Sequence, residues 1–314
     1  MELSVILVNW NGIDFLPKCL NSIAENPPSV PFEIVVVDND SSDGSVAWMR
    51  SPEAEEMLRG IPFTIIESGE NLGFGRANNL GFRHTTTPFV LVLNPDTIIT
   101  KGALDKLLDA LRWGVKVGAS APRLLNSDGS QQFNVWDRPP DPVKIVVEGF
   151  GLSALLPKRV RSNWLFGSHF DYTERTFVPA VSGAAICVKR EVLDAVGGFD
   201  DEIFMYGEDA DLCLRISKAG WKILYEPQAE IMHHSGKSAT QRWDDLERNI
   251  REATALMEFQ KKHLSRPMLF ANSLTKAFVL SVYRIRRRLL GAYDDNLDEL
   301  IKVQLRYCRQ SLSS

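Results

Sequence analysis

Residues 197–238 read GGFDDEIFMYGEDADLCLRISKAGWKILYEPQAEIMHHSGKS and combine acidic and histidine side chains in one short helix–strand unit. Glu208, Asp209 and Asp211 are three carboxylates within four positions. Apolar residues at helical spacing follow them as far as Gly220, and a glycine after the last periodic residue typically ends a helix. The acids therefore lie at the start of a predicted helix.

Two apolar runs come next and predict two strands, at residues 221–225 and 229–232. The second strand leads to His233 and His234, in a loop that contains Gly236. A unit of this kind can hold a carboxylate base near a cation site. Alternatively, the acids only complement the positive end of the helix macrodipole, and this segment by itself leaves both interpretations open.

The composition is that of an ordinary globular protein. The chain has 314 residues, enough for one large α/β domain or two smaller ones. Hydrophobic residues make up 44% and charged residues 24% of it, and the net charge of −4 gives no sign of nucleic-acid binding.

The four cysteines show no CxxC spacing and lie among apolar residues, which favours buried, reduced thiols. The N-terminal residues lack the basic region and cleavage site of a signal peptide, and no run of about 20 apolar residues predicts a spanning helix. We therefore expect a cytoplasmic protein.

Short apolar runs alternate with helical patterns along the N-terminal part of the chain. The predicted strands are residues 3–8, 34–37, 63–66 and 89–93, and each is followed by a polar loop. This alternation is typical of a parallel sheet with helical crossovers, so we expect a mostly parallel, Rossmann-like α/β sheet flanked by helices.

Polar side chains follow three of these strands. They are Asn9, Asn11, Asp38, Asp40 and Asp96. Asp and Asn commonly cap helices and form turns, but ligands of open α/β sheets bind at the carboxyl ends of the strands. Acids after two separate strands, together with the later acid cluster, predict a carboxylate-lined crevice at this edge.

The middle of the chain is less regular. Residues 117–125 predict a further strand, whereas residues 131–178 show little periodicity and predict a long insertion, of the kind that forms lids or acceptor-binding elements. A strand at residues 178–189 is interrupted by Ser182, Gly183, Ala184 and Ala185, and such small residues allow a ligand to approach the backbone.

The run from Gly73 to Asn78, GFGRAN, begins like the dinucleotide fingerprint GxGxxG. Asn78 replaces the third glycine, however, and the run follows the third strand rather than the first. Both features argue against a Rossmann dehydrogenase, and the absence of GxxxxGK[ST] and GxSxG excludes a P-loop and a nucleophile elbow.

Asp96 ends the turn Asn94-Pro95-Asp96, in which the proline fixes the backbone and directs the carboxylate out of the sheet. An oxygen ligand at this place suits Mg²⁺ or Mn²⁺, which keep several waters and bind diphosphate oxygens. His233 or His234 can add one ligand for Mn²⁺. Zinc is disfavoured, since the sequence offers no set of several histidines and cysteines.

Seven segments together resemble family 2 glycosyltransferases with the GT-A fold, which transfer sugars from nucleotide donors with inversion. In chain order the segments are VILVNWNG, VVVDNDSSDGS, NLGFGRANNLG, LVLNPDT, SGAAICVKR, GGFDDEIFMYGEDADLCLR and HHSGKS, and they span about residues 3–238. The combination is highly specific, although no single segment is.

The resemblance implies a role for each candidate. Donor-binding residues would be Val8, Asn9, Asn11, Asp38, Asp40, Asn71, Gly75, Asn78, Asn94, Pro95 and Asp96, with Asp38 on the base, Asp40 on the ribose and Asp96 on the metal. Asp209 would be the catalytic base with Glu208 beside it, and the acceptor would meet Ser182, Gly183, Ala184 and Glu208. His233 would complete the metal site.

One departure from the family pattern concerns the metal. Many GT-A enzymes have Asp-x-Asp where this chain has Asn94-Pro95-Asp96, so one carboxylate is lost, although Asn94 can still contact the donor. Between the two histidines, strand alternation from Ile231 favours His233 as the inward-facing one.

The implied reaction needs one general base for the acceptor hydroxyl and one cation for the leaving diphosphate. The NPDT and HHSGKS segments look most like bacterial rhamnosyltransferases, which use dTDP-L-rhamnose to extend lipid-linked saccharides of the cell envelope. UDP-galactose, UDP-glucose and UDP-N-acetylglucosamine are alternative donors. A nucleotidyltransferase and a non-catalytic nucleotide-sugar binder are alternatives from other classes.

The resemblance divides the chain into a GT-A catalytic domain at residues 1–242 and a helical extension at 243–314. The catalytic domain would consist of a nucleotide-sugar half, 1–115, and an acceptor half, 116–242.

Within the extension, Pro267 separates two predicted helices, 243–262 and 268–290. The second helix carries an apolar seam made of Leu274, Phe278, Val282, Ile285 and Leu289. Residues 265–290 contain no acid and six basic residues, namely Arg266, Lys276, Arg284, Arg286, Arg287 and Arg288. A basic amphipathic helix predicts peripheral contact with the inner face of the cytoplasmic membrane. Packing on the catalytic domain and a homodimer contact are the alternatives.

Overall fold

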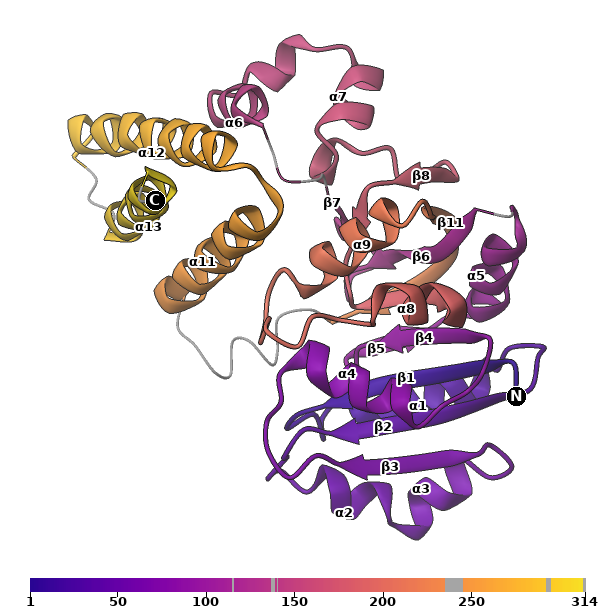
Figure 1. Cartoon of the computed structure of the whole chain (residues 1–314). Helices are drawn as coiled ribbons and strands as arrows, with labels where there is room; N and C mark the ends of the chain where they lie inside the picture. The colour runs from indigo at the N-terminus through magenta and orange to yellow at the C-terminus, as the bar shows by residue number, and fades with distance from the viewer. Residues whose placement is uncertain (115, 137–138, 140, 235–244, 292–294, 313–314) are drawn as a thin grey trace. The chain divides into compact units, whose positions relative to one another are not determined.

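The computed structural model describes residues 1–114, 116–136, 139, 141–234, 245–291 and 295–312. The chain forms two compact units, residues 1–136 with 171–238 and residues 137–170 with 239–314 (Figure 1). These units differ from the predicted division at residue 242 in that residues 137–170 cluster with the C-terminal helices. The predicted loop around Gly236, including the GKS of the HHSGKS segment, lies outside the described residues.

The first unit is built on a nine-stranded, mostly parallel sheet of order β3-β2-β1-β4-β10-β6-β11-β5, with β8 paired to β11. Its strands are β1 (Leu3–Asn9), β2 (Phe32–Asp38), β3 (Phe63–Glu67), β4 (Phe89–Leu93), β5 (Thr97–Ile99), β6 (Val117–Leu125), β8 (Thr176–Val178), β10 (Ala185–Lys189) and β11 (Lys222–His233). A separate two-stranded ladder joins β7 (Val135–Trp136) to β9 (Ala180–Val181). The predicted fold class is confirmed.

Helices cover both faces of this sheet (Figure 1). They are α1 (Leu16–Glu25), α2 (Ser45–Met49), α3 (Pro52–Met57), α4 (Phe74–Arg83), α5 (Ala103–Arg112), α8 (Arg190–Val196) and α9 (Glu208–Lys218). Apolar residues of α1 and α5 join one core cluster with Val5 and Leu7 of β1. The alternate residue Val8 packs with Ala77 of α4 on the opposite face. Because both faces of the strand are covered, β1 is buried along its whole length and is mostly apolar.

The parallel register aligns the strand ends that carry the polar candidates. Asn9 at the end of β1 is the partner of Asp38 at the end of β2, and Leu93 at the end of β4 is the partner of Leu7. The Asn94-Pro95-Asp96 turn follows directly. The register therefore brings the three candidate segments to one edge of the sheet, as predicted.

The prediction of two strands at 221–225 and 229–232 was wrong. They are halves of a single strand, β11, whose register with β6 shifts between Glu226 and Glu230. The cause is Pro227, which has no backbone N–H to give to the ladder and so favours a bulge.

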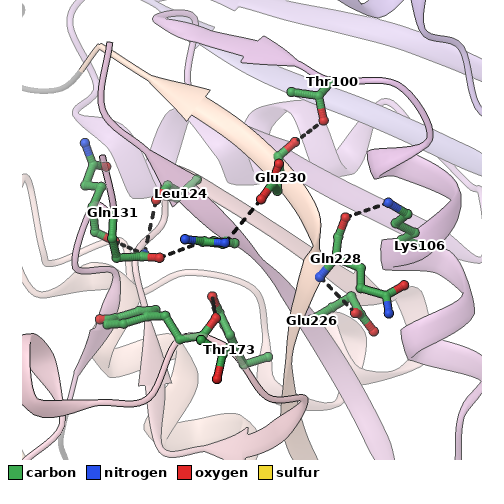
Figure 2. A network of polar contacts seen from close by, with 12 residues as sticks. Thr100, Lys106, Leu124, Gln131, Thr173, Glu226, Gln228 and Glu230 are labelled. Carbon is green, nitrogen blue, oxygen red and sulfur yellow. Dashed lines mark hydrogen bonds and ion pairs between the residues drawn. The ribbon is translucent and has the colours of Figure 1, made fainter. Parts of the chain in front are cut away.

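Polar contacts hold this bulge in place (Figure 2). The Gln228 N–H donates to Glu226 Oε1 at 3.1 Å, and Lys106 Nζ donates to the Gln228 carbonyl at 2.7 Å. Thr100 Oγ1 donates to the Glu230 carbonyl at 2.6 Å. Beyond the bulge, β11 pairs with β5 and ends at His233.

The second unit consists of helices, which are α6 (Pro142–Gly149), η1 (Leu152–Leu155), α7 (Lys158–Trp164), η2 (Gly167–His169), α11 (Asp245–His263), α12 (Arg266–Leu289) and α13 (Asp295–Leu312). Its core contains Met257, Leu269, Val303 and Tyr307. The described helices include none with the length and apolarity needed to cross a membrane.

One detail of the C-terminal prediction needs correction. Pro267 does not separate the helices, because it lies in the first turn of α12, where a proline costs no hydrogen bond. The buried face of α12 includes Leu269 and Ala277, and Phe278 and Ile285 of the predicted apolar seam are exposed.

Candidate active site

Asp38 joins the loops that follow β1 and β2. Asn9 Nδ2 donates to Asp38 Oδ1 at 3.0 Å and to Ser41 Oγ at 3.1 Å, and the Ser41 N–H donates to Asp38 Oδ2 at 2.9 Å. The Asp38 carboxylate is 2% exposed and both its oxygens accept hydrogen bonds. It therefore fixes the two loops to each other. Asp40 is exposed beside it, in the left-handed region at φ 68°.

Asn11 and Asn71 extend this network. Asn11 Oδ1 accepts from the Ser42 N–H at 2.8 Å. Asn71 Oδ1 accepts from Asn39 Nδ2 at 3.0 Å and from the Gly73 N–H at 3.1 Å. The loops after β1, β2 and β3 are thus cross-linked by side-chain amides at the strand ends.

The glycines of the GFGRAN segment make room for another loop of the chain. A Cβ on Gly73 would lie 2.3 Å from the Phe204 carbonyl oxygen, and one on Gly75 would lie 3.1 Å from Phe199 Cβ. The Phe74 N–H donates to the Phe204 carbonyl at 3.2 Å. The loop that leads to the acid cluster therefore packs against the start of α4.

Asn78, in the same segment, is completely buried, and its Nδ2 donates to the Phe74 carbonyl at 3.0 Å. Its neighbour Asn79 reaches the loop instead, with Nδ2 donating to the Phe199 carbonyl at 2.8 Å and Oδ1 accepting from the Phe199 N–H at 2.8 Å. These contacts give the segment a packing role, which explains its departure from the dinucleotide fingerprint.

Asp96 and His233 meet at the edge of the sheet, because β11 places His233 opposite Thr97. His233 Nε2 lies 3.2 Å from Asp96 Oδ1, and Asn94 Nδ2 lies 3.4 Å from the same nitrogen. His234 points elsewhere, with Nδ1 2.7 Å from Ser127 Oγ. Strand alternation therefore identified the histidine that faces Asp96.

Gln132 sets the tautomer of His233. Gln132 Nε2 donates to Asn126 Oδ1 at 3.0 Å and to the His233 carbonyl at 3.2 Å, so Gln132 Oε1 is the acceptor that faces His233 Nδ1 at 2.7 Å. The proton of the neutral ring is then on Nδ1, and the Nε2 lone pair points toward the Asp96 carboxylate. Two acceptors this close require a proton or a cation between them.

This arrangement fits a divalent cation. Within the described ranges, no third acid, histidine or cysteine joins Asp96 and His233. Two protein ligands are enough for Mg²⁺ or Mn²⁺, which complete their shells with waters and substrate phosphates. The donor set is therefore suited to a metal that is carried largely by a diphosphate.

Asp209 lies at the N-terminus of α9 and is half-buried. Its Oδ2 accepts from the Gly183 N–H at 3.0 Å. A Cβ on Gly183 would lie 3.2 Å from the Phe74 ring and 3.4 Å from Asp209 Cβ, so the close approach of this amide favours glycine. The next residue, Ala184, accepts at its carbonyl from the Asn94 N–H at 2.9 Å. One short loop thus connects the acid to the metal-site turn.

The neighbouring acids have different environments. Burial, followed by the charge of Asp209, raises the pKa of Glu208 to about 8. Burial also raises the pKa of Asp209, although the Gly183 hydrogen bond favours its ionised form. Asp209 is therefore the group that ionises first, while Glu208 keeps its proton at neutral pH.

Asp211 has a structural role. It is completely buried and its Oδ2 accepts from Arg215 Nε at 2.6 Å, while Arg215 Nη1 donates to the carbonyls of Val196 and Gly198, both at 2.7 Å. The Asp211–Arg215 pair therefore attaches α9 to the turn at Val196 and Gly198, which precedes the loop before α9. Only two of the three clustered acids are thus candidates for chemistry.

Sequence reasoning missed Gln132, Asn39 and Arg215. Gln132 lies in the insertion without periodicity and is 101 positions from its partner His233. Asn39 lies between two predicted site residues in the Asp38-Asn39-Asp40 loop, which is a usable signal. Arg215 follows Asp211 at i,i+4 spacing, a pattern that often forms helix ion pairs.

The sequence matches Glycosyl transferase family 2 over residues 4–193 and Glycosyl transferase family group 2 over residues 155–290. The N-acetylglucosaminyl-diphospho-decaprenol L-rhamnosyltransferase of Mycobacterium tuberculosis is 31% identical over 255 residues, which cover 75% of this chain and 77% of that protein. The chain belongs to glycosyl transferase family 2. Rhamnosyltransferase WbbL of Escherichia coli K12, another similar protein, is 26% identical over 242 residues, covering 74% of this chain and 83% of WbbL.

A solved structure supports the same fold for this glycosyltransferase. The mannosyltransferase PcManGT from Pyrobaculum calidifontis, in complex with GDP-Man and Mn²⁺, superposes with a TM-score of 0.61 at 20% identity, covering 99% of this chain and 86% of that one. The GT-A fold implied by the sequence resemblance is confirmed.

Proposed function

We propose that this family 2 glycosyltransferase transfers L-rhamnose from dTDP-L-rhamnose to a hydroxyl of a lipid-linked saccharide in cell-envelope polysaccharide synthesis. The transferred sugar and the acceptor class are supported by the M. tuberculosis relative, whose name specifies L-rhamnosyl transfer and N-acetylglucosaminyl-diphospho-decaprenol. The observation that carries the proposal is the Gly183–Ala184 loop, which holds Asp209 on one side and the Asn94 turn on the other.

Asp209 is the general base in this proposal. An acceptor hydroxyl is a poor nucleophile until a carboxylate within hydrogen-bond reach takes its proton. The Gly183 N–H and the α9 N-terminus favour the ionised form of Asp209 against the effect of burial, and the Gly183 hydrogen bond orients the carboxylate for that step. One base is sufficient for the hydroxyl to displace the nucleotide directly, which inverts the anomeric carbon, and no second carboxylate is needed as a nucleophile.

Asp96 and His233 would hold a Mg²⁺ or Mn²⁺ ion, and Asn94 and Pro95 would lie beside the donor. The ion would neutralise charge that develops on the departing diphosphate. Gln132 keeps the ring proton on Nδ1 by accepting its hydrogen bond, so that the Nε2 lone pair faces the proposed ion.

The remaining donor contacts are also proposals. Asp38 and Asn9 form the floor of the nucleoside site, with Val8 beneath them, while Asp40 and Asn11 lie at its rim. Asn71 and Gly75 border the diphosphate side, and Asn78 supports the helix behind them. Ser182, Gly183, Ala184 and Glu208 face the acceptor.

Thermal-shift measurements with nucleotide sugars test the donor assignment. We expect dTDP-L-rhamnose to stabilise the protein more than UDP-galactose, UDP-glucose or UDP-N-acetylglucosamine, and only in the presence of Mn²⁺ or Mg²⁺, because binding to the folded state raises the melting temperature. A larger shift with a UDP-sugar would replace the donor assignment but keep the family.

Gln132→Met should weaken metal binding by about 10-fold, because loss of a hydrogen bond behind a metal-bound histidine typically costs 10–100-fold. The readout is the Mn²⁺ concentration that half-saturates the donor-induced thermal shift. Gln131→Met, the adjacent residue, is the matched control. Equal Mn²⁺ requirements in the two variants would contradict the role of Gln132.

Glu208→Gln should change how stability depends on pH. The folded-state pKa of Glu208, about 8, lies above its ordinary value of 4.5, so between these pH values the folded chain holds a proton that the unfolded chain has released. This carboxyl therefore lowers the free energy of unfolding as pH rises through that window.

Melting temperatures of the wild type and of Glu208→Gln at several pH values from about 5 to 8 provide the test. We expect the melting temperature of the variant, relative to that of the wild type, to rise steadily with pH. The variant should be the more stable protein near the upper end of this pH range. Parallel curves would show that Glu208 titrates normally.

A further inference from the structure

The second unit exposes an apolar ridge along α12. Phe278 is 59%, Ile285 56% and Leu289 82% exposed, although they occupy the seam that an amphipathic helix would be expected to bury. Near the C-terminal end of the helix, Val282, Ile285, Leu289 and Leu290 line an open hollow of about 420 Å³ together with Arg286. Soluble proteins rarely leave a continuous apolar surface of this kind without a binding role.

The central insertion widens this ridge. A Cβ on Gly149, at the end of α6, would lie 2.6 Å from Val279 Cγ1, so α6 and α12 are in close contact. The Phe150 ring meets the Phe278 ring edge-on at 6.3 Å, and the Tyr283 hydroxyl donates to the Gly149 carbonyl. The insertion and the C-terminal helix therefore form one surface.

Residues just beyond α6 add exposed apolar side chains. Leu152 is 42% exposed and Leu155 is 81% exposed, both in η1. A side chain that is four-fifths exposed contributes almost nothing to the folded core. The stability of the fold therefore does not account for leucines at these two positions.

The segments that carry the apolar residues are strongly basic. The segments 142–164 and 266–290 contain ten lysines and arginines but a single acid, Glu148. Asp298 of α13 pairs with Arg284 and Arg288. The remaining basic residues include Arg159 of α7 and Arg286 of α12.

We propose that α6, η1 and α12 together form a surface that binds an anionic lipid bilayer. Apolar side chains set among lysines and arginines fit the boundary between acyl chains and acidic headgroups. A second copy of the chain fits less well, since a two-fold interface would place two strongly basic patches against each other. The surface does not depend on the sugar donor, so it extends the proposed function without resting on it.

Sedimentation of the full-length protein with vesicles tests this surface. We expect binding to vesicles of phosphatidylcholine with phosphatidylglycerol, little binding to phosphatidylcholine alone, and loss of binding as salt rises, because exposed charges are screened. Equal binding to neutral vesicles, or none to anionic ones at low salt, would overturn the proposal.

Two pairs of variants locate the contact. The double variant Leu155→Ser, Leu289→Ser should weaken vesicle binding by about 10-fold or more, since each leucine loses its insertion into the bilayer. Leu312→Ser, an exposed leucine of α13, should bind like the wild type. Arg286→Gln with Arg287→Gln, two exposed residues of α12, should also weaken binding, whereas Arg83→Gln with Lys101→Gln, which removes equal charge from the first unit, should not.

Analytical ultracentrifugation of the same variants without lipid completes the test. The proposal expects no change of oligomeric state in the leucine variant. A wild-type dimer that this variant dissociates, with vesicle binding unaffected, would show that the surface joins two copies instead. Hydrolysis of the nucleotide sugar, measured without vesicles, should persist in all four variants, which separates this proposal from the proposed function.

Discussion

Asp209→Asn should lower the turnover number for sugar transfer by about 10³-fold and leave donor affinity near that of the wild type. Asparagine is isosteric and can still accept the Gly183 N–H, so the loop geometry should survive. Only the ability to take the acceptor proton is lost, and that ability is used in the transition state alone. The measurement is kcat under saturating donor, with donor affinity from thermal shifts.

Glu208→Gln is the matched control for this variant, because it lies in the same helical turn and already carries a proton at neutral pH according to its raised pKa. We expect it to retain far more turnover than Asp209→Asn. Similar losses in the two variants would mean that the acids act as a unit. Turnover of Asp209→Asn within a few-fold of the wild type would remove Asp209 as the base.

Asp96→Ala should abolish the metal-dependent part of donor binding, a loss of more than about 100-fold, since removing even a residue behind a metal ligand costs 10–100-fold. His233 alone cannot hold a cation against the diphosphate. Binding of the nucleoside without phosphates should persist, because Asp96 lies at the diphosphate end of the proposed site. Titrations of dTDP-L-rhamnose and thymidine, with and without Mn²⁺, measure both quantities.

Asp38→Ala provides the contrast. It removes the carboxylate that fastens the loops after β1 and β2, so it should weaken binding of thymidine and of the sugar nucleotide alike. Equal losses of thymidine binding in Asp38→Ala and Asp96→Ala would contradict the separate roles assigned to the two acids.

The parallel strands could be predicted because their sequences are apolar on both faces. The run 3–8, for example, contributes to two core clusters on opposite sides of the sheet. Polar residues at its end then indicate the edge of the sheet at which the candidate residues gather. His233, rather than His234, could also be predicted to face Asp96, because the alternation of side chains along a strand is a local property of the sequence.

Other features depend on contacts between distant parts of the chain. Gln132 becomes important only because β6 and β11 are neighbours, which no local pattern reveals. The insertion could not be placed from its sequence, since its packing on α12 rests on a few contacts such as Gly149 with Val279. The apolar seam of α12 could be recognised from its sequence, but its exposure could not, because an amphipathic pattern is the same whether its apolar face is buried or exposed.

The most direct test of the proposed function is transfer by the wild-type protein from dTDP-L-rhamnose to a prenyl-diphosphate-linked N-acetylglucosamine, in competition with UDP-sugars. We predict a rhamnosylated lipid, release of dTDP, dependence on Mn²⁺ or Mg²⁺, and an inverted anomeric configuration in the NMR spectrum of the product. Retention of configuration would contradict a single-base displacement at Asp209. Failure to transfer sugar from any of these donors would contradict the proposed function.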